Sequence, residues 1–249
     1  MGIMVAPYRE IREVVHSLSN TLSSREFITS GGSDITRLLN ITREDIQQFG
    51  ALWSDLKLDQ YMADGGFYRY RRYGQFELNP HTLEKHQLPH EPYFQPGYIN
   101  TLNGDLKRTF EPLTVEFARH HVLDRLIRFL AEICNGASGR KIPWNVRLHP
   151  YRIVARKGIN GMPTPEGLHR DGVTFISSIL IRRHNVLGGV TTITDADRKP
   201  LTDVQLTHPF DLMLANDEAT MHSVSSISMA NSELSTAYRD VLVIAFTQP

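Results

Sequence analysis

The spacing of apolar residues divides the chain into a helical first part and a strand-rich second part. Apolar side chains recur at helical spacing in three stretches, residues 8–18, 42–56 and 112–135. Thr42 and Asp45 open the second stretch with the spacing of a capping box, which predicts that a helix starts there. We expect the third helix to end at Asn135-Gly136, because glycine commonly terminates helices.

From Ile142 onward the pattern changes to short β-branched runs separated by turn residues. An aromatic-rich run at 67–76 predicts a further strand, whereas residues 80–96 hold four prolines and predict a long loop of the kind that borders active sites. Many short strands favour a sandwich, barrel or jelly roll with the helices as a buttress on one sheet, which is an α+β fold class. The seven predicted strands are 146–155, 173–181, 190–193, 204–207, 211–214, 221–224 and 238–246.

Length and composition predict one soluble globular domain. The 249 residues are 41% apolar and 22% charged, and Lys plus Arg balance Asp plus Glu at 27 each, so no overall field attracts a polyanion or an acidic membrane. Cys134 is the only cysteine, which excludes an intrachain disulfide, and no stretch nears the ~18 consecutive apolar residues of a membrane span. We therefore expect a cytoplasmic protein.

His169 and Asp171 form a candidate metal-binding pair at the start of a predicted strand. Residues two apart on an extended segment point to the same side, so an imidazole nitrogen and a carboxylate oxygen converge there. His222, which lies 51 residues after Asp171 in another short predicted strand, supplies a third ligand. Such a pair is frequent by chance in a chain with 11 histidines, but the Gly-rich approach and the later His give it weight. Two histidines and one carboxylate on one face of an octahedron are typical of iron(II) oxygenases.

Arg239 lies seventeen residues beyond His222, at the start of an apolar strand pattern. A guanidinium buried in such a strand is costly unless it meets an anion. Because arginine binds carboxylates through two parallel hydrogen bonds, the far end of a dicarboxylate is a suitable partner. The alternative is a structural salt bridge, with the adjacent Asp240 as one partner.

The motifs around these residues resemble those of a known enzyme family. They are Leu168-His-Arg-Asp171, Gly188-Gly189, Met221-His222-Ser-Val224 and Ala237-Tyr-Arg-Asp240. Together they are similar to the bacterial 2-oxoglutarate/iron(II) dioxygenases that hydroxylate free L-amino acids, the L-isoleucine 4-hydroxylase-like family. The resemblance covers the last hundred residues well, is weaker around Tyr70 and is absent from the first sixty.

The resemblance implies a double-stranded β-helix in one domain, residues 1–249, with 1–140 as mainly helical and loop support and 141–249 as the jelly-roll core. It also implies iron(II) on His169, Asp171 and His222, and 2-oxoglutarate on Arg239. Oxygen and an amino acid-like small molecule would be the other substrates, with succinate and carbon dioxide released. The sequence leaves a homodimer open.

A carboxylate on the substrate needs a second cation, and the predicted strand 146–155 offers Arg152 beside His149, a pair similar to a Leu-His-x-x-Arg segment of that family. On a regular strand His149 and Arg152 face opposite sides. Pro150 is typical of a bulge, which would turn both side chains inward. We therefore expect an irregularity at Pro150 and substrate contacts from both residues. The alternative for His149 is a core histidine.

Two other classes of function remain open at this point. One is a non-catalytic, cupin-like jelly roll that binds metal without turnover. The other is a nucleic-acid-binding module built on the run Tyr68-Arg-Tyr-Arg-Arg-Tyr73, where aromatic rings could stack on bases and arginines could bind phosphates. The balanced charge counts against this second alternative and favours a strand with a solvated face or a cavity wall.

Overall fold

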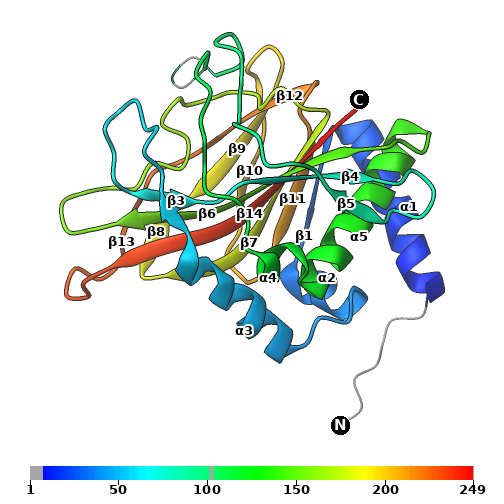
Figure 1. Cartoon of the computed structure of the whole chain (residues 1–249), viewed down its shortest axis with the longest axis horizontal. Helices are drawn as coiled ribbons and strands as arrows, with labels where there is room; N and C mark the ends of the chain where they lie inside the picture. Colours follow the sequence, from blue (N-terminus) through cyan, green and yellow to red (C-terminus); the bar gives the residue numbers. More distant parts are fainter. Residues whose placement is uncertain (1–7, 101, 103, 249) are drawn as a thin grey trace.

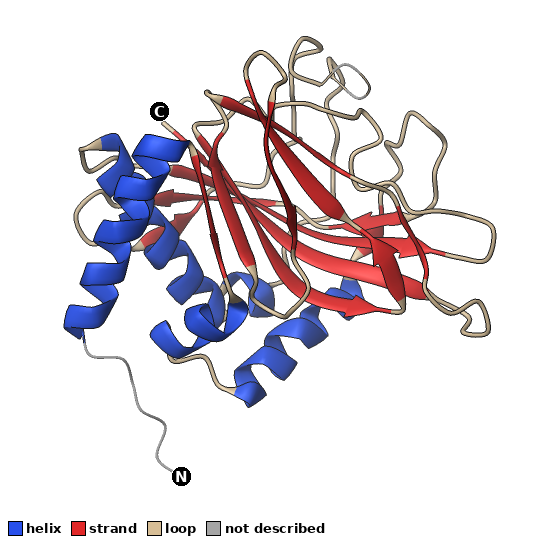
Figure 2. Cartoon of the chain, turned by 180° about the vertical axis from the view of Figure 1, so that it is seen from behind, coloured by secondary structure: helices blue, strands red, loops and turns tan. Residues whose placement is uncertain are grey.

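Two antiparallel sheets lie face to face in the computed structural model, which describes residues 8–100, 102 and 104–248 (Figures 1 and 2). The large sheet has the order β1 (Phe27–Ser30), β11 (Leu212–Asn216), β7 (Phe175–His184), β14 (Ala237–Thr247), β6 (Asn145–Ala155), β3 (Arg69–Arg71) and β2 (Lys57–Leu58). Beside β6 it also holds β4 (Gly74–Leu78) and β5 (Lys85–Gln87). The small sheet has the order β10 (Pro200–Gln205), β9 (Val190–Asp195) and β12 (Thr220–Val224). A separate two-stranded sheet pairs β8 (Val186–Gly188) with β13 (Ile227–Met229).

The helices gather on the side of the large sheet that faces away from the small one (Figure 2). They are α1 (Tyr8–Arg25), α2 (Gly32–Leu38), α3 (Arg43–Ala51), α4 (Val115–Ala118) and α5 (His121–Ser138), with the 3-10 helix η1 (Leu52–Asp55) after α3. This arrangement confirms the predicted α+β jelly roll with helical buttresses. None of the helices among the described residues has both the length and the apolar character that a membrane span requires.

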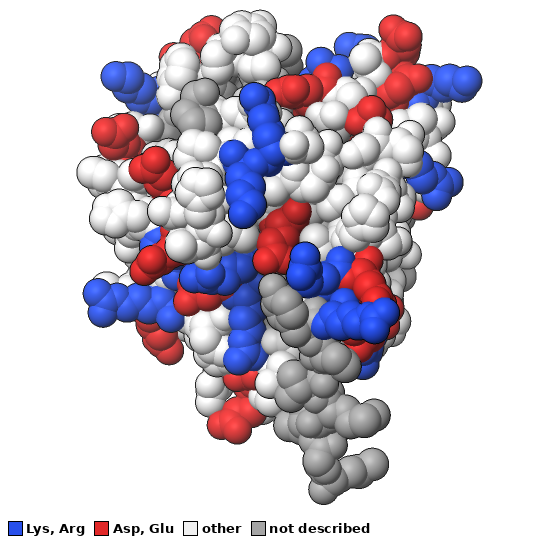
Figure 3. All heavy atoms as spheres, turned by 90° about the vertical axis from the view of Figure 1, so that its right-hand side faces the viewer, with Lys and Arg blue, Asp and Glu red and all other residues white. Residues whose placement is uncertain are grey.

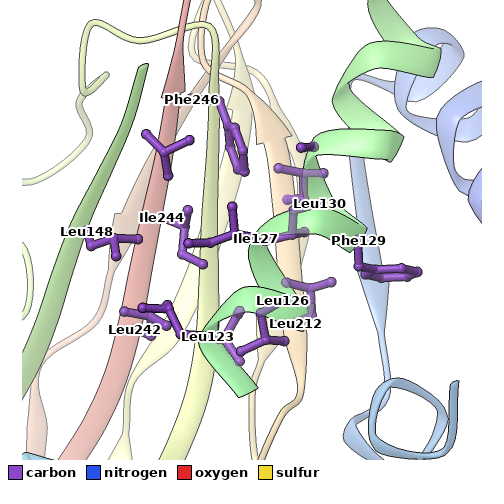
Figure 4. Close-up of a cluster of buried hydrophobic side chains, with 14 of the residues drawn as sticks. Leu123, Leu126, Ile127, Phe129, Leu130, Leu148, Leu212, Leu242, Ile244 and Phe246 are labelled. Atoms are coloured by element: carbon purple, nitrogen blue, oxygen red, sulfur yellow. The ribbon is translucent and has the colours of Figure 1, made fainter. Parts of the chain in front are cut away.

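Because side chains alternate along a strand, one face of β14 packs in the core and the other lines a cavity. Leu242, Ile244 and Phe246 point toward α5 and pack there against side chains such as Leu126 and Leu130 (Figure 4). The residues between them point to the other face, where they line a cavity between the two sheets. The helical face therefore holds the main core, and the opposite face is left for a site.

The third predicted helix is two helices, because the chain breaks at Arg119 and His120. The expected end at Asn135-Gly136 is wrong, since α5 continues to Ser138 and ends at Gly139, which has a φ of 66°. Asn135 instead accepts hydrogen bonds through its side chain from residues of the following loop. The capping box of Thr42 and Asp45 is confirmed, with both reciprocal hydrogen bonds present.

The seven predicted strands from residue 146 onward are present, and the first 140 residues add β1 to β5 to the large sheet. The run 67–76 splits into β3 and β4, and β5 lies inside the predicted loop 80–96. These additional strands have two to five residues each, too short to show a clear alternation. Cys134 is buried in α5. On the face shown in Figure 3, acidic and basic side chains are interspersed, in keeping with the balanced composition.

Candidate metal centre

His169 and His222 lie directly opposite each other in an antiparallel backbone pair. The His169 amide donates to the His222 carbonyl at 3.0 Å, and the His222 amide donates to the His169 carbonyl at 2.9 Å. Residues paired in this way present their side chains on the same face, and the two imidazole rings lie 4.5 Å apart between centroids. This backbone pairing between the loop of His169 and β12 thus brings together two potential ligands that are 53 residues apart in the sequence.

Asp171 joins the pair because it stands two residues beyond His169 on the same extended segment. One of its carboxylate oxygens, Oδ2, lies 3.4 Å from His222 Nε2. The potential ligand atoms of His169, Asp171 and His222 all lie within 4.8 Å of one another. The structure therefore assembles the predicted triad as one group that could hold a metal ion.

The His169 ring is oriented by the backbone carbonyl of Gly167, 2.9 Å from Nδ1. Because a carbonyl oxygen only accepts, Nδ1 must carry the hydrogen, and the lone pair of Nε2 is free to coordinate a metal. Burial alone would raise the pKa of Asp171, but the hydrogen bond from His222 and the charges of both histidines lower it well below its usual range. Asp171 is thus ionised, as a metal ligand must be.

Asp217 holds the loop that carries Asp171, and the sequence pattern gave no reason to single it out. Its carboxylate accepts the backbone N–H groups of Asp171, Gly172 and Val173 at 2.8 to 3.1 Å. Gly172 adopts a φ of 73° inside this turn. Asp217 is almost fully buried, and both its burial and the charge of Asp171 raise its pKa. It is a positioning residue for the triad.

The triad opens into a cavity of about 90 Å³ between the two sheets. A single buried water needs about 10–15 Å³ of such cavity volume, so the cavity has room for a small ligand but not for a macromolecule. β6 and β14 contribute alternate residues to it, which are Arg147, His149, Tyr151 and Ile153 from β6 and Arg239, Val241, Val243 and Ala245 from β14. The predicted loop 80–96 does border the site, through Tyr93 and Gln95.

Arg239 lies in this cavity with no partner for two of its nitrogens. The side chain is buried, and neither Nε nor Nη2 has a hydrogen-bond partner among the residues that the structure describes. Burial and the neighbouring charge of Arg183 lower the pKa of Arg239 to about 10, which leaves it charged at neutral pH. The alternative of a salt bridge to Asp240 is wrong, because strand alternation turns that carboxylate to the other face. The orphaned guanidinium fits an anionic ligand.

Gly189 allows this position of Arg239. Its φ is 72°, and a Cβ added there would lie 3.1 Å from Arg239 Cδ and 3.2 Å from Arg183 Nη1. The Gly188-Gly189 turn therefore lets the backbone approach both arginines closely.

Arg152 does not face the cavity, so this part of the substrate prediction is wrong. The pairing of β6 with β14 runs without a register shift from Asn145 to Ala155, and Pro150 makes no bulge. Arg152 consequently points to the opposite face from His149 and forms two hydrogen bonds with Asp240, at 2.7 and 2.8 Å. Its guanidinium also lies 4.5 Å from the centre of the Tyr238 ring. Arg152 is a structural residue.

His149 does line the cavity, surrounded by residues that sequence reasoning missed. Its ring stacks between Tyr73 and Tyr151, and Arg71 donates to its Nδ1. Burial and the charge of Arg71 lower the pKa of His149 well below its usual value, so the ring is neutral. Arg71 belongs to the run Tyr68–Tyr73, most of which is buried and unavailable to nucleic acid. Arg69 and Arg71 form a cavity wall instead, one of the two predicted alternatives.

Replacing Arg239 by methionine should stabilise the ligand-free protein. The substitution removes an unpaired buried charge and keeps an unbranched side chain of similar length, so we expect a gain of about 1–3 kcal/mol in unfolding free energy. Urea unfolding followed by circular dichroism measures it. Arg156→Met, at an exposed position, serves as the control and should change stability by less than about 0.5 kcal/mol. A loss of stability in Arg239→Met would show that the guanidinium has a partner within the fold.

Arg152→Ala should have the opposite effect. It removes one ion-pair partner from the fully buried Asp240, which among the described residues then keeps Arg182 alone, so we expect a loss of about 3 kcal/mol in unfolding free energy. The same urea titration tests this, with Arg156→Ala as the matched control. A variant as stable as the parent would contradict the structural assignment of Arg152.

The chain is similar to known proteins over most of its length. The model of the 2OG-Fe dioxygenase family matches residues 50–245. A bsmA homolog from Methylobium petroleophilum is 28% identical, with a TM-score of 0.85 over 94% of this chain and 93% of that chain. A comparison with curated proteins gives no match.

Two further crystal structures share the fold at lower identity. IDO from Bacillus thuringiensis is 19% identical, with a TM-score of 0.77 over 96% of this chain and 99% of that one. The Fe(II)/(alpha)ketoglutarate-dependent dioxygenase TqaL is 22% identical, with the same TM-score over 98% of this chain and 91% of that one. The family match extends over more than half of the chain and includes the triad and Arg239. The chain therefore belongs to the 2OG-Fe dioxygenase family, whose members need iron(II) and 2-oxoglutarate.

Proposed function

We propose that this dioxygenase holds iron(II) with His169, Asp171 and His222, binds 2-oxoglutarate through Arg239, and hydroxylates a small free amino acid. The observation that carries the proposal is the buried guanidinium of Arg239, which lies in the same cavity as the triad and has two nitrogens without a hydrogen-bond partner among the described residues. A family cosubstrate with two carboxylates supplies the anion that this group lacks.

The donor set fits iron(II). Two imidazole nitrogens and one carboxylate oxygen on one face leave the remaining coordination positions to small ligands. When bound, iron(II) would supply the oxidising chemistry with 2-oxoglutarate and molecular oxygen: one oxygen atom of O2 would enter the succinate formed as carbon dioxide leaves, and the other would hydroxylate a C–H bond of the substrate. The chain's own residues orient the metal ligands and enclose the site. Gly167 fixes the His169 ring, Asp217 fixes the loop of Asp171, and apolar β14 side chains exclude water beside Arg239.

The preference for an amino acid rests on the resemblance of the four sequence motifs and on the character of the cavity. Its lining carries charges of both signs, including Glu166, whose Oε2 has no hydrogen-bond partner. A small ligand with both a carboxylate and an ammonium group would satisfy such a lining, whereas a hydrocarbon would leave it unpaired. Release of succinate from 2-oxoglutarate, screened over the common amino acids with iron(II) and ascorbate, tests this preference.

Single substitutions of the triad should abolish metal binding and succinate release together. His169→Ala, Asp171→Ala and His222→Ala each remove one ligand, so we expect metal affinity to fall by more than about 100-fold. Asp217→Asn disturbs only the support of the loop and should cost about 10-fold to 100-fold. Isothermal titration calorimetry with manganese(II), which avoids oxidation, measures the affinities.

Asp197→Asn, at an exposed position in the turn after β9, is the matched control and should bind the metal as the parent does. Circular dichroism confirms that each variant is folded. If all three triad variants bind manganese(II) as tightly as the parent, the ligand assignment is wrong.

A further inference from the structure

Three arginines surround His149 in the cavity, and the metal chemistry proposed above uses none of them. Arg71 comes from β3, Arg147 from β6 and Arg108 from the loop before α4. All three line the same cavity as His149, Arg71 donates to its Nδ1, and the charges of all three lower the pKa of the ring. We call Arg71, Arg108 and Arg147 the arginine cluster.

Carboxylates neutralise little of the charge of the arginine cluster. Among the described residues, no carboxylate lies within ion-pair distance of Arg108 or Arg147. Arg71 has Asp59 at 3.8 Å, but that carboxylate is held by Arg69 at 2.8 Å. In each of the three arginines Nε is buried and has no hydrogen-bond partner in the part of the chain that the structure describes. Arg71 and Arg108 are each only 2% exposed, so water does not replace the missing anion.

Neutral groups hold the cluster in place instead. The guanidinium carbon of Arg71 lies 3.6 Å from the centre of the Phe110 ring, and that of Arg108 lies 4.9 Å from the centre of the Tyr93 ring. Arg108 also donates to Gln95 at 2.9 Å. Stacking on aromatic rings orients a guanidinium without neutralising it. The cluster is therefore preorganised and still carries its charge.

The His149 ring adds a donor of fixed orientation. Arg71 can only donate, so Nδ1 of His149 must accept, and the neutral ring then carries its hydrogen on Nε2. The unpaired Nε groups of the three arginines and this N–H form a set of donors in one cavity, which is the pattern of an anion site.

The cluster is separate from the position of Arg239. Arg71 pairs with Tyr151 on β6, and Tyr151 pairs with Val241 on β14, so Arg71 and Arg239 lie two strands and two residues apart in the sheet. That separation is about 10 Å across the strands and about 7 Å along them. Gln95 joins the cluster to the metal loop, because it accepts from Arg108 and donates to the Asp171 carbonyl at 3.1 Å. The cluster and Arg239 can therefore hold two different ligands.

The charges of the cavity favour an anionic second ligand. Five arginines line it, against Glu166 and Asp171, and Asp59 behind the wall neutralises Arg69. The charges of a divalent metal and of doubly negative 2-oxoglutarate cancel each other. The net positive charge of the cavity lining therefore remains to be neutralised by the primary substrate. A neutral zwitterion would leave this excess unpaired.

We propose that the arginine cluster binds the carboxylates of the primary substrate, and that this substrate is a small molecule of net negative charge, such as an acidic amino acid. The inference rests on the proposed function, since it assigns Arg239 to 2-oxoglutarate. It replaces Arg152 as the cation for the substrate and makes Arg71 and Arg108 determinants of specificity.

Calorimetric titration of the protein loaded with manganese(II) and 2-oxoglutarate tests the proposal without turnover. The ligands are isosteric pairs, L-aspartate with L-asparagine and L-glutamate with L-glutamine, together with the other amino acids and their N-acetyl derivatives. We expect the tightest ligand to be an anion that binds at least about 30-fold more tightly than its neutral amide. A neutral amino acid that binds more tightly than every anion would overturn the proposal.

Variants of the cluster connect this preference to its residues. Arg71→Met and Arg108→Met should each weaken the tightest ligand by at least about 30-fold and leave 2-oxoglutarate affinity within about threefold of the parent. Arg71→Lys and Arg108→Lys preserve the charge in case a methionine variant does not fold. Arg156→Met, outside the cavity, is the control. Unchanged affinity for the anion in folded Arg71 and Arg108 variants would contradict the assignment.

Bromide offers a test that depends on neither the ligand panel nor the metal. Anomalous diffraction from crystals of the metal-free protein soaked in bromide should show one ion at the cluster and another at Arg239. An ion at Arg239 alone would overturn the second anion site. The proposed function has a separate test. A parent protein that binds neither manganese(II) nor 2-oxoglutarate in the calorimeter would contradict that function, even if bromide binds at the arginine cluster.

Discussion

The alternation of side chains along β6 and β14 is the constraint on which both the core and the site depend. These two strands pair over eleven residues without a slip, so every second residue of each faces the same way. On β14 one set packs on α5 and the other set carries Arg239 into the cavity. A slip of one residue would move Arg239 into the helical core and bring Asp240 into the site. The register thus fixes the position of Arg239, the residue that we propose binds 2-oxoglutarate.

The cavity accumulates positive charge that the fold does not neutralise. Arg152 and Arg182 both form ion pairs with Asp240, and Arg69 forms one with Asp59. Arginines with a structural role are thus paired with carboxylates. Inside the cavity it leaves Nε unpaired in Arg71, Arg108, Arg147 and Arg239. Such groups lower the stability of the ligand-free protein and are stabilised when anions bind. This contrast between paired and unpaired arginines is the basis on which we propose that the unpaired ones bind ligands.

The sequence predicted the parts of the site that depend on local spacing. His169 and Asp171 share a face because they are two residues apart, and Arg239 stood out as a charge in an apolar strand. Asp217 and the arginine cluster were missed, since their roles arise from contacts between distant segments that no local pattern reveals. The error over Arg152 has a simple cause. We expected Pro150 to break the strand, but the ladder continues through it, and regular alternation decides the outcome.

A crystal structure of the protein with manganese(II) and 2-oxoglutarate tests the central claim most directly. We expect the metal on His169 Nε2, the Asp171 carboxylate and His222 Nε2, with the far carboxylate of 2-oxoglutarate on Nε and Nη2 of Arg239 and the arginine cluster left for the second substrate. A metal bound away from this triad would contradict the account, as would a 2-oxoglutarate carboxylate held by Arg71 and Arg108 in place of Arg239.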